Sequence, residues 1–256
     1  MPFEPVAAAR LSSAVVEQIE TLILRGILNP GERLPAEREL AERLEVSRPS
    51  LREALAELQK RGLLEARAGA GVFVAEALGA AFPPALVRLF SRHREAVYDY
   101  IAFRRDLEGQ AAARAAVHGT PSDLKVIKAA LEAMEAAHRA RPAPEREAEL
   151  DAAFHLAILE ASHNVVLLHM MRAMYELLKQ GVFYHRQVMF RQKPTRDTLL
   201  DQHRAINAAI QARDPEAARE AVEAHLGFVE RALTEQDKAK TQEAIARQRL
   251  EHARAR

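Results

Sequence analysis

Three histidines and one aspartate in the second half of the chain have the side-chain types of a metal site. Asp151 and His155 are four residues apart, so on a helix both project from the same face. His203 and His225 lie on later segments, and a helical bundle can bring ligands from several helices to one point. One carboxylate and three imidazoles suit a borderline divalent ion such as Zn²⁺, Ni²⁺ or Mn²⁺. Spacing alone favours a plain surface pair of Asp151 and His155, because Asp-x₃-His is a common pattern.

A second chemically distinctive set lies in the run LPAERELAERLEVSRPSLREALAELQKRGLLEARAGAGVFV, which covers residues 34–74. Arg48 and Arg52 fall in the first turns of a helix that Ser47 can cap, and Ser47 and Ser50 can donate to phosphate. Arginine suits bidentate contact with guanine or phosphate. This arrangement predicts the recognition helix of a helix-turn-helix. Two further candidates for DNA contact are Arg38, at the start of the preceding helix, and Arg67, on the hairpin.

The elements needed to present these arginines can be predicted from the same segment. Apolar spacing predicts helices over 12–26 and about 36–44, and a third from Ser47 to Gly62. Alternating residues around Gly69-Ala70-Gly71 then predict a hairpin, the wing. Residues 1–75 are therefore expected to form a winged helix-turn-helix domain. In the alternative interpretation the arginines are ordinary surface charges, which pair with Glu37, Glu42 or Glu53.

The rest of the chain reads as an antiparallel all-α bundle with short loops. A linker at 76–83 precedes an all-helical domain at 84–235. Thr120, Asn164 and Asp214 are start signals for helices. The tail, 236–256, is helix-prone but has no convincing apolar stripe, and it is expected to be a frayed or disordered, solvated extension. The predicted helices run approximately over 84–92, 95–117, 121–139, 146–161, 165–189, 195–212 and 215–234.

Composition excludes several classes of protein. The 256 residues contain no cysteine, so disulfides and thiolate chemistry are excluded. No apolar run approaches the roughly 20 residues that span a bilayer, and no signal peptide is evident, so we expect a cytoplasmic protein with no membrane partner. The net charge is +1, and residues 1–75 carry ten Lys and Arg against eleven Asp and Glu. DNA binding must therefore depend on where the arginines lie.

Residues 10–75 resemble the DNA-binding domain of the GntR superfamily of bacterial transcription regulators, through the run LPAEREL…VSRPSLREAL…L…GLL. The resemblance implies DNA contacts at Arg38, Ser47, Arg48, Ser50 and Arg52. It also implies contacts from the wing tip, where this chain has Gly69-Ala70-Gly71 in place of the more glycine-rich tip, often with a Thr, that is usual in the family.

The second domain is similar to the FCD ligand-binding domain of the FadR subfamily. The matching runs are YDYIAFRRDLEGQAAARAA, DAAFHLAILEASHNVVLL, LLDQHRAINAAI and DPEAAREAVEAHLGFVERAL. Members with a metal use an Asp, a His four residues later and two His on later helices. The resemblance therefore implies that Asp151, His155, His203 and His225 are metal ligands.

The same resemblance suggests where an effector binds. Arg104 falls in the pattern R-x-x-L-E, whose arginine faces the cavity, and an Arg fork can hold a carboxylate. The alternative is that Arg104 pairs with Glu108 on its own helix. Asn164 is a further candidate contact. The runs EASHNVVLLHMMRAM and YHRQVMF resemble regulators that respond to small C2–C3 acids, which ranks lactate or glycolate first and pyruvate next.

These expectations combine into a homodimeric repressor or activator that binds a pseudo-palindromic operator in double-stranded DNA. A small 2-hydroxy or 2-oxo carboxylate, bound near the metal, would control its affinity for the operator, and the linker near Pro83-Pro84 would transmit the change. Two alternatives stay open. The metal could be purely structural, or the chain could be a metal-dependent enzyme, although no general base stands out near the ligand motifs.

Overall fold

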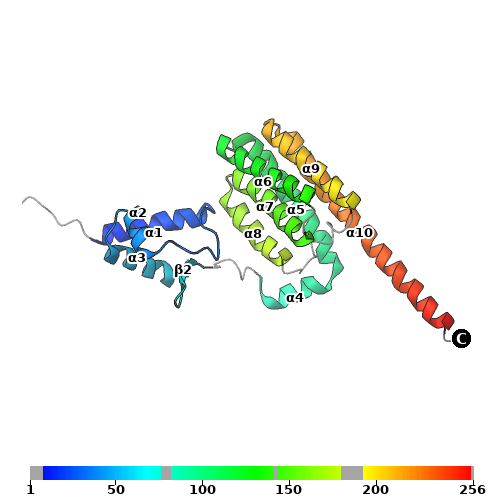
Figure 1. Ribbon diagram of the computed structural model, residues 1–256, viewed down its shortest axis with the longest axis horizontal. Helices are drawn as coiled ribbons and strands as arrows, with labels where there is room; N and C mark the ends of the chain where they lie inside the picture. The colour runs from blue at the N-terminus through cyan, green and yellow to red at the C-terminus, as the bar shows by residue number, and fades with distance from the viewer. Residues whose placement is uncertain (1–7, 76–81, 141–142, 180–192, 255–256) are drawn as a thin grey trace, which may run out of the picture. The chain divides into compact units, whose positions relative to one another are not determined.

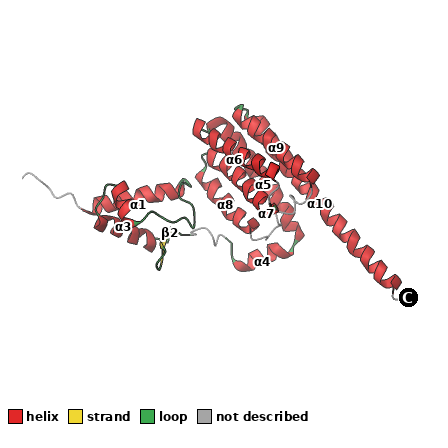
Figure 2. Cartoon of the chain, viewed as in Figure 1, coloured by secondary structure: helices red, strands yellow, loops and turns green. Residues whose placement is uncertain are grey.

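The computed structural model describes residues 8–75, 82–140, 143–179 and 193–254, which divide into two compact units, Met1–Phe82 and Pro83–Arg256. Helices dominate the described chain, and the two strands belong to the first unit (Figure 2). The predicted fold class, a winged helix-turn-helix followed by an all-α bundle, is confirmed. The end of the predicted helix 165–189, together with the run YHRQVMF, lies outside the described residues.

The first unit contains helices α1 (Ala8–Leu24), α2 (Glu37–Arg43) and α3 (Arg48–Lys60), followed by strands β1 (Leu64–Arg67) and β2 (Gly71–Val74). The strands pair antiparallel with Leu64 opposite Val74, as the alternation of apolar residues predicted. Helix α3 packs against α1 through its apolar stripe. The buried core of this unit includes Val15, Val16, Ile19, Leu34, Ala41, Leu51, Ala54, Leu55, Leu58, Leu64 and Val74.

The second unit runs through α4 (Pro84–Arg92), α5 (Arg94–His118), α6 (Pro121–Ala140), α7 (Pro144–Ala161), α8 (Val165–Lys179), α9 (Lys193–Gln211) and α10 (Pro215–Arg254). Helix α10 lies along α5 and α9, while α7 contacts α5, α6 and α8 (Figure 1). This packing places α5, α7, α9 and α10 around one apolar interior, with Phe154, Ile206 and Leu226 fully buried. Those four helices carry all the residues of the candidate metal site and Arg104.

Helix starts in this unit lie where the cap residues predicted them. Thr120 and Asp123 form a reciprocal capping box at α6, and Asp214 Oδ1 accepts a hydrogen bond from Ala217 N at 3.0 Å at the start of α10. Helix α10 continues to Arg254, beyond its predicted end at about residue 234, as the helix-prone composition of the tail allows. Residues 236–254 are helical, because Ala, Glu, Lys, Gln and Arg favour helix and no Gly or Pro interrupts them, and residues 238–252 are exposed. The missing apolar stripe leaves this segment solvated, as we expected.

Candidate functional site

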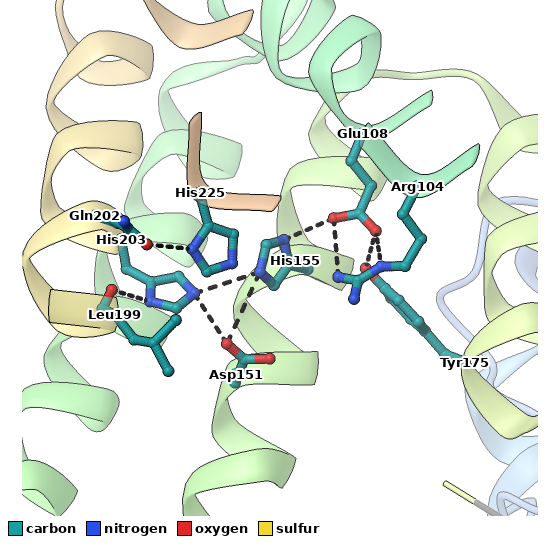
Figure 3. A network of polar contacts seen from close by, with 9 residues as sticks. All are labelled: Arg104, Glu108, Asp151, His155, Tyr175, Leu199, Gln202, His203 and His225. Carbon is teal, nitrogen blue, oxygen red and sulfur yellow. Dashed lines mark hydrogen bonds and ion pairs between the residues drawn. The ribbon is translucent and has the colours of Figure 1, made fainter. Parts of the chain in front are cut away.

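Asp151, His155, His203 and His225 lie together inside the second unit (Figure 3). The first two come from successive turns of α7, His203 from α9 and His225 from α10. One potential ligand atom from each residue lies within 4.8 Å of all the others, and all four side chains are buried. The plain surface pair of Asp151 and His155, which spacing alone had favoured, is therefore wrong.

The rings of His203 and His225 are held by hydrogen bonds on the side away from the cluster. His203 Nδ1 lies 2.6 Å from the carbonyl oxygen of Leu199, one turn earlier on α9. His225 Nδ1 lies 3.0 Å from Gln202 Oε1. Both oxygens can only accept, so each Nδ1 carries the proton, and in a neutral ring the lone pair is on Nε2. Such second contacts fix the tautomer and orientation of a histidine that binds a metal.

His155 has the same arrangement, with a carboxylate as the acceptor. Its Nδ1 lies 2.8 Å from Glu108 Oε2. Its Nε2 lies 3.3 Å from Nε2 of His203, which in turn is 3.0 Å from Asp151 Oδ1. Two ligand atoms of one metal ion, each about 2.0–2.1 Å from it, are about 3.0–3.4 Å apart. The donor set therefore fits a divalent ion, which could bind all four groups at once, whereas a single proton could bridge only two.

Burial sets the protonation of these groups. It lowers the pKa of His225 well below its usual value, and the neighbouring His203 and His155 lower it further. It also lowers the pKa of His155, against the opposing influence of Glu108 and Asp151. His155 and His225 are therefore neutral near pH 7, which is the form that binds a metal.

Arg104, one turn before Glu108 on α5, forms the second part of the site. Arg104 Nε lies 2.5 Å from Glu108 Oε1, and its terminal Nη2 lies 3.3 Å from Oε2. Tyr175 of α8 donates to the same Oε1 at 2.9 Å. Burial alone would raise the pKa of Glu108, but Arg104 and His155 together hold it well below the usual range. Arg104 is thus linked to His155 of the candidate metal cluster through a single ionised carboxylate (Figure 3).

In the first unit, the start of α3 carries the residues we expected to contact DNA. The Ser47 hydroxyl caps α3 by accepting from Ser50 N at 3.3 Å. Ser50 itself is buried and its hydroxyl lies 2.9 Å from that of Ser47. Its position gives Ser50 a role in the cap and leaves no exposed surface for phosphate. Arg48, in contrast, is exposed on the first turn.

The other expected DNA contacts have carboxylate neighbours on the surface. Arg52 Nε lies 2.8 Å from Glu37, while Arg38 is 3.9 Å from Glu42. Such exposed pairs contribute only about 0–1 kcal/mol, so a phosphate could replace the carboxylate at little cost. On the wing, Arg67 pairs with Glu65 and its guanidinium lies 4.3 Å from the centre of the Phe73 ring.

Both glycines of the wing tip adopt positive φ. Gly69 has φ 71° and Gly71 has φ 110°, a region that residues with a side chain rarely adopt. A Cβ at Gly71 would lie 3.0 Å from Nε of Arg33, whereas one at Gly69 would meet nothing within 4 Å. The glycines therefore shape the tip, and the chain has Ala70 between them.

Two segments of the chain match known protein families. Residues 11–74 match the family described as bacterial regulatory proteins, gntR family, and residues 99–228 match the FCD domain. The chain belongs to the GntR family, with an FCD domain. The family resemblance predicted from the sequence is confirmed.

Several relatives cover most of this GntR-family chain. It is 38% identical to the "Putative L-lactate dehydrogenase operon regulatory protein" of Escherichia coli (strain K12), over 88% of this chain and 86% of that protein. It is 36% identical to the "Glc operon transcriptional activator" of the same strain, over 87% of this chain and 89% of the relative. The chain is 34% identical to "HTH-type transcriptional regulator LutR" of Bacillus subtilis (strain 168), over 83% of this chain and 96% of that protein. These relatives are transcription regulators and not enzymes.

A solved structure supports the same fold. "Streptococcus agalactiae GntR" superposes with a TM-score of 0.51 at 26% identity, covering 86% of this chain and 99% of that chain. Among the described residues of this GntR-family chain, no helix combines the length and apolar character needed to cross a bilayer.

Asn164 and Glu108 have contacts that bear on their expected roles. Asn164 Oδ1 accepts a hydrogen bond from Leu167 N at 3.1 Å, so Asn164 caps α8, as its place before this helix predicted, and its contact with an effector stays a prediction. Glu108 was considered only as a partner of Arg104, yet it also contacts His155. The R-x-x-L-E pattern places Glu108 beside Arg104, but only the packing of α5 on α7 brings it to the metal cluster.

Proposed function

We propose that this GntR-family protein is a homodimeric transcription regulator whose affinity for operator DNA is controlled by a small carboxylic acid. A divalent ion, Zn²⁺, Ni²⁺ or Mn²⁺, binds at Asp151, His155, His203 and His225. The acid binds beside it, with its carboxylate on Arg104. The observation that carries the proposal is that three oriented imidazoles and one carboxylate lie together in one cluster. Glu108 links this cluster to Arg104, because its carboxylate contacts both His155 and Arg104.

Charge balance favours a monoanionic effector. The buried charges near the cluster are Asp151, Glu108 and Arg104, since Glu147 pairs with Arg196. With neutral histidines, these charges and a divalent ion leave one excess positive charge, which a single carboxylate neutralises. A dianion would leave an unpaired negative charge in the interior, which is costly. The bound ion supplies a Lewis-acidic partner for the second oxygen of a 2-hydroxy or 2-oxo acid.

The names of two relatives bear on the identity of the effector acid. Two are named as regulators of L-lactate dehydrogenase and Glc operons, which supports lactate or glycolate as the effector, with pyruvate next. We place the protein in the cytoplasm, where its DNA is. The DNA-contacting side chains in this proposal are Arg38, Ser47, Arg48 and Arg52, with Arg67, Gly69 and Gly71 on the wing.

The decisive measurement is operator affinity in the presence of metal and acid. The protein is stripped with chelator, reloaded with Zn²⁺, and titrated onto a labelled fragment from its own upstream region while fluorescence anisotropy is followed. We expect L-lactate or glycolate to change the dissociation constant at least about fivefold, the lower end of typical allosteric coupling. Metal-free protein should not respond. An unchanged affinity at saturating acid, in Zn²⁺-loaded protein shown by calorimetry to bind that acid, would refute the coupling.

The same experiment tests the structural alternative. If His225→Ala retains its fold and binds operator, yet no longer responds to the acid, the ion takes part in sensing. If instead removal of the metal unfolds the second unit, the ion is structural.

A further inference from the structure

The Glu108 side chain contacts three other side chains, which come from three different helices. Its carboxylate accepts from Arg104 on its own helix, from His155 of α7 and from Tyr175 of α8, at 2.5, 2.8 and 2.9 Å respectively (Figure 3). Neither Glu108 nor Arg104 has more than 2% of its side chain exposed. The Glu108 carboxylate therefore occupies a buried anion-binding site, which Arg104, His155 and Tyr175 form around it.

The occupant of this site is part of the protein itself. Arg104 presents two nitrogens, Nε and Nη2, to the two oxygens of Glu108, which is the bidentate geometry in which a guanidinium binds any carboxylate. An external acid that uses the same edge of Arg104 must first displace Glu108. The displaced carboxylate would keep two partners, because its Oε2 contacts His155 and its Oε1 contacts Tyr175.

We propose that Glu108 is an internal competitor for the effector and a positioning residue for the metal. Before the acid binds, Glu108 pairs with Nε and Nη2 of Arg104, which blocks this edge of the guanidinium, and it orients His155. The acid carboxylate takes Arg104, and Glu108 shifts toward His155 and Tyr175, which transmits binding from α5 to α7 and α8. This inference rests on the proposed function, because it assumes that the effector is a carboxylate that binds Arg104.

The Glu108→Gln substitution tests both roles, with opposite expected signs. An amide oxygen accepts more weakly than a carboxylate, so His155 is less well oriented and Zn²⁺ affinity should fall about tenfold, as for other outer contacts of metal ligands. The loss of the charge weakens the pairing of Arg104 with residue 108, so the acid should bind Zn²⁺-saturated protein about fivefold more tightly. Competition with a chromogenic chelator measures Zn²⁺ affinity. Calorimetry with L-lactate, glycolate and pyruvate measures acid binding, and circular dichroism checks the fold.

Tyr175→Phe is the second variant, and it keeps the test valid if Glu108→Gln does not fold. It removes a donor that stabilises the carboxylate more strongly once Arg104 no longer neutralises it, but leaves the Glu108 oxygen that faces His155 untouched. Acid binding should weaken about threefold, as expected for loss of part of a charge-assisted hydrogen bond, with little change in Zn²⁺ affinity. Glu160→Gln is the matched control, because Glu160 also pairs with a mostly buried arginine, Arg172, outside the cluster. It should change neither affinity.

The outcomes separate this inference from the proposed function. If wild-type protein binds an acid and Glu108→Gln binds it equally or more weakly, the internal competitor is overturned and the proposed function stands. Tighter or unchanged acid binding by Tyr175→Phe also overturns the displacement. If Zn²⁺-loaded wild-type protein binds none of the three acids, the proposed effector class fails and the displacement fails with it. A fall in Zn²⁺ affinity in Glu108→Gln would still support the positioning role, and unchanged Zn²⁺ affinity would refute that role.

Discussion

Removal of one imidazole from the cluster gives a quantitative test of the metal centre. A ligand that binds only folded protein stabilises it by RT ln(1 + [L]/Kd), about 2.7 kcal/mol when Zn²⁺ is present at 100 times its dissociation constant. For a unit of 150–250 residues each kcal/mol raises Tm by about 2–4 °C. Zn²⁺ should therefore raise the Tm of the second unit by about 5–11 °C. His225→Ala, which removes one of four ligands, should lose most of that increase.

The assay is differential scanning calorimetry of the full chain, with each protein compared with its own chelator-treated form. This comparison is needed because the deletion of a buried ring also leaves a cavity, which lowers the Tm of the metal-free protein by itself. His118→Ala is the control, since His118 is exposed at the end of α5 and its variant should retain the full increase. The metal assignment is refuted if Zn²⁺ stabilises wild type and His225→Ala equally, or stabilises neither.

Two further predictions concern other parts of the chain. In anisotropy titrations, Arg48→Ala should weaken operator binding by about 1–3 kcal/mol, and it should reduce the salt dependence of binding if Arg48 contacts phosphate. Arg61→Ala is the control and should change operator binding little, because the Arg61 guanidinium pairs with Glu20 and Glu57 at the far end of α3. Asp123→Asn should cost about 1 kcal/mol in urea unfolding, because Asp123 accepts from Thr120 at the start of α6 and lies 3.0 Å from His163. Hydrogen bonds from Thr120 lower the pKa of Asp123 despite the opposing effect of burial, so this contribution is present above the unfolded pKa of about 3.9 and disappears as the pH falls through the lower folded value. A difference from wild type that persists unchanged at pH 2 would contradict this account.

Local signals in the sequence were sufficient to predict most helix starts. Thr120, Asn164 and Asp214 each satisfy backbone donors of the turn that follows, and this interaction depends on few other residues. Helix α10 extends beyond its predicted end at about residue 234, because the apolar stripe used to place that end indicates where a helix is buried and not where it stops. A solvated helix needs only favourable residue types and pairs such as Glu243 with Arg247.

The direction of individual side chains was harder to predict. Ser50 follows Arg48 by two residues, yet Ser50 is buried and Arg48 is exposed, a difference that depends on how α3 packs against α1 and α2. Similarly, Glu108 becomes part of the site because α7 and α8 present His155 and Tyr175 to it. The sequence pattern predicts which residues share a helix face, whereas the neighbours of that face depend on the tertiary packing.

The order of the ligands along the chain has a consequence during synthesis. The first unit is complete by Phe82, but the candidate metal cluster needs His225, which lies on the final helix. At about 5–20 residues per second, the ribosome needs roughly 7–30 s to make the intervening segment. During that interval a nascent chain has the residues for DNA recognition but lacks the complete cluster. If the protein has the proposed function, newly made regulator therefore completes its candidate sensor last, after the winged helix-turn-helix unit has been synthesised.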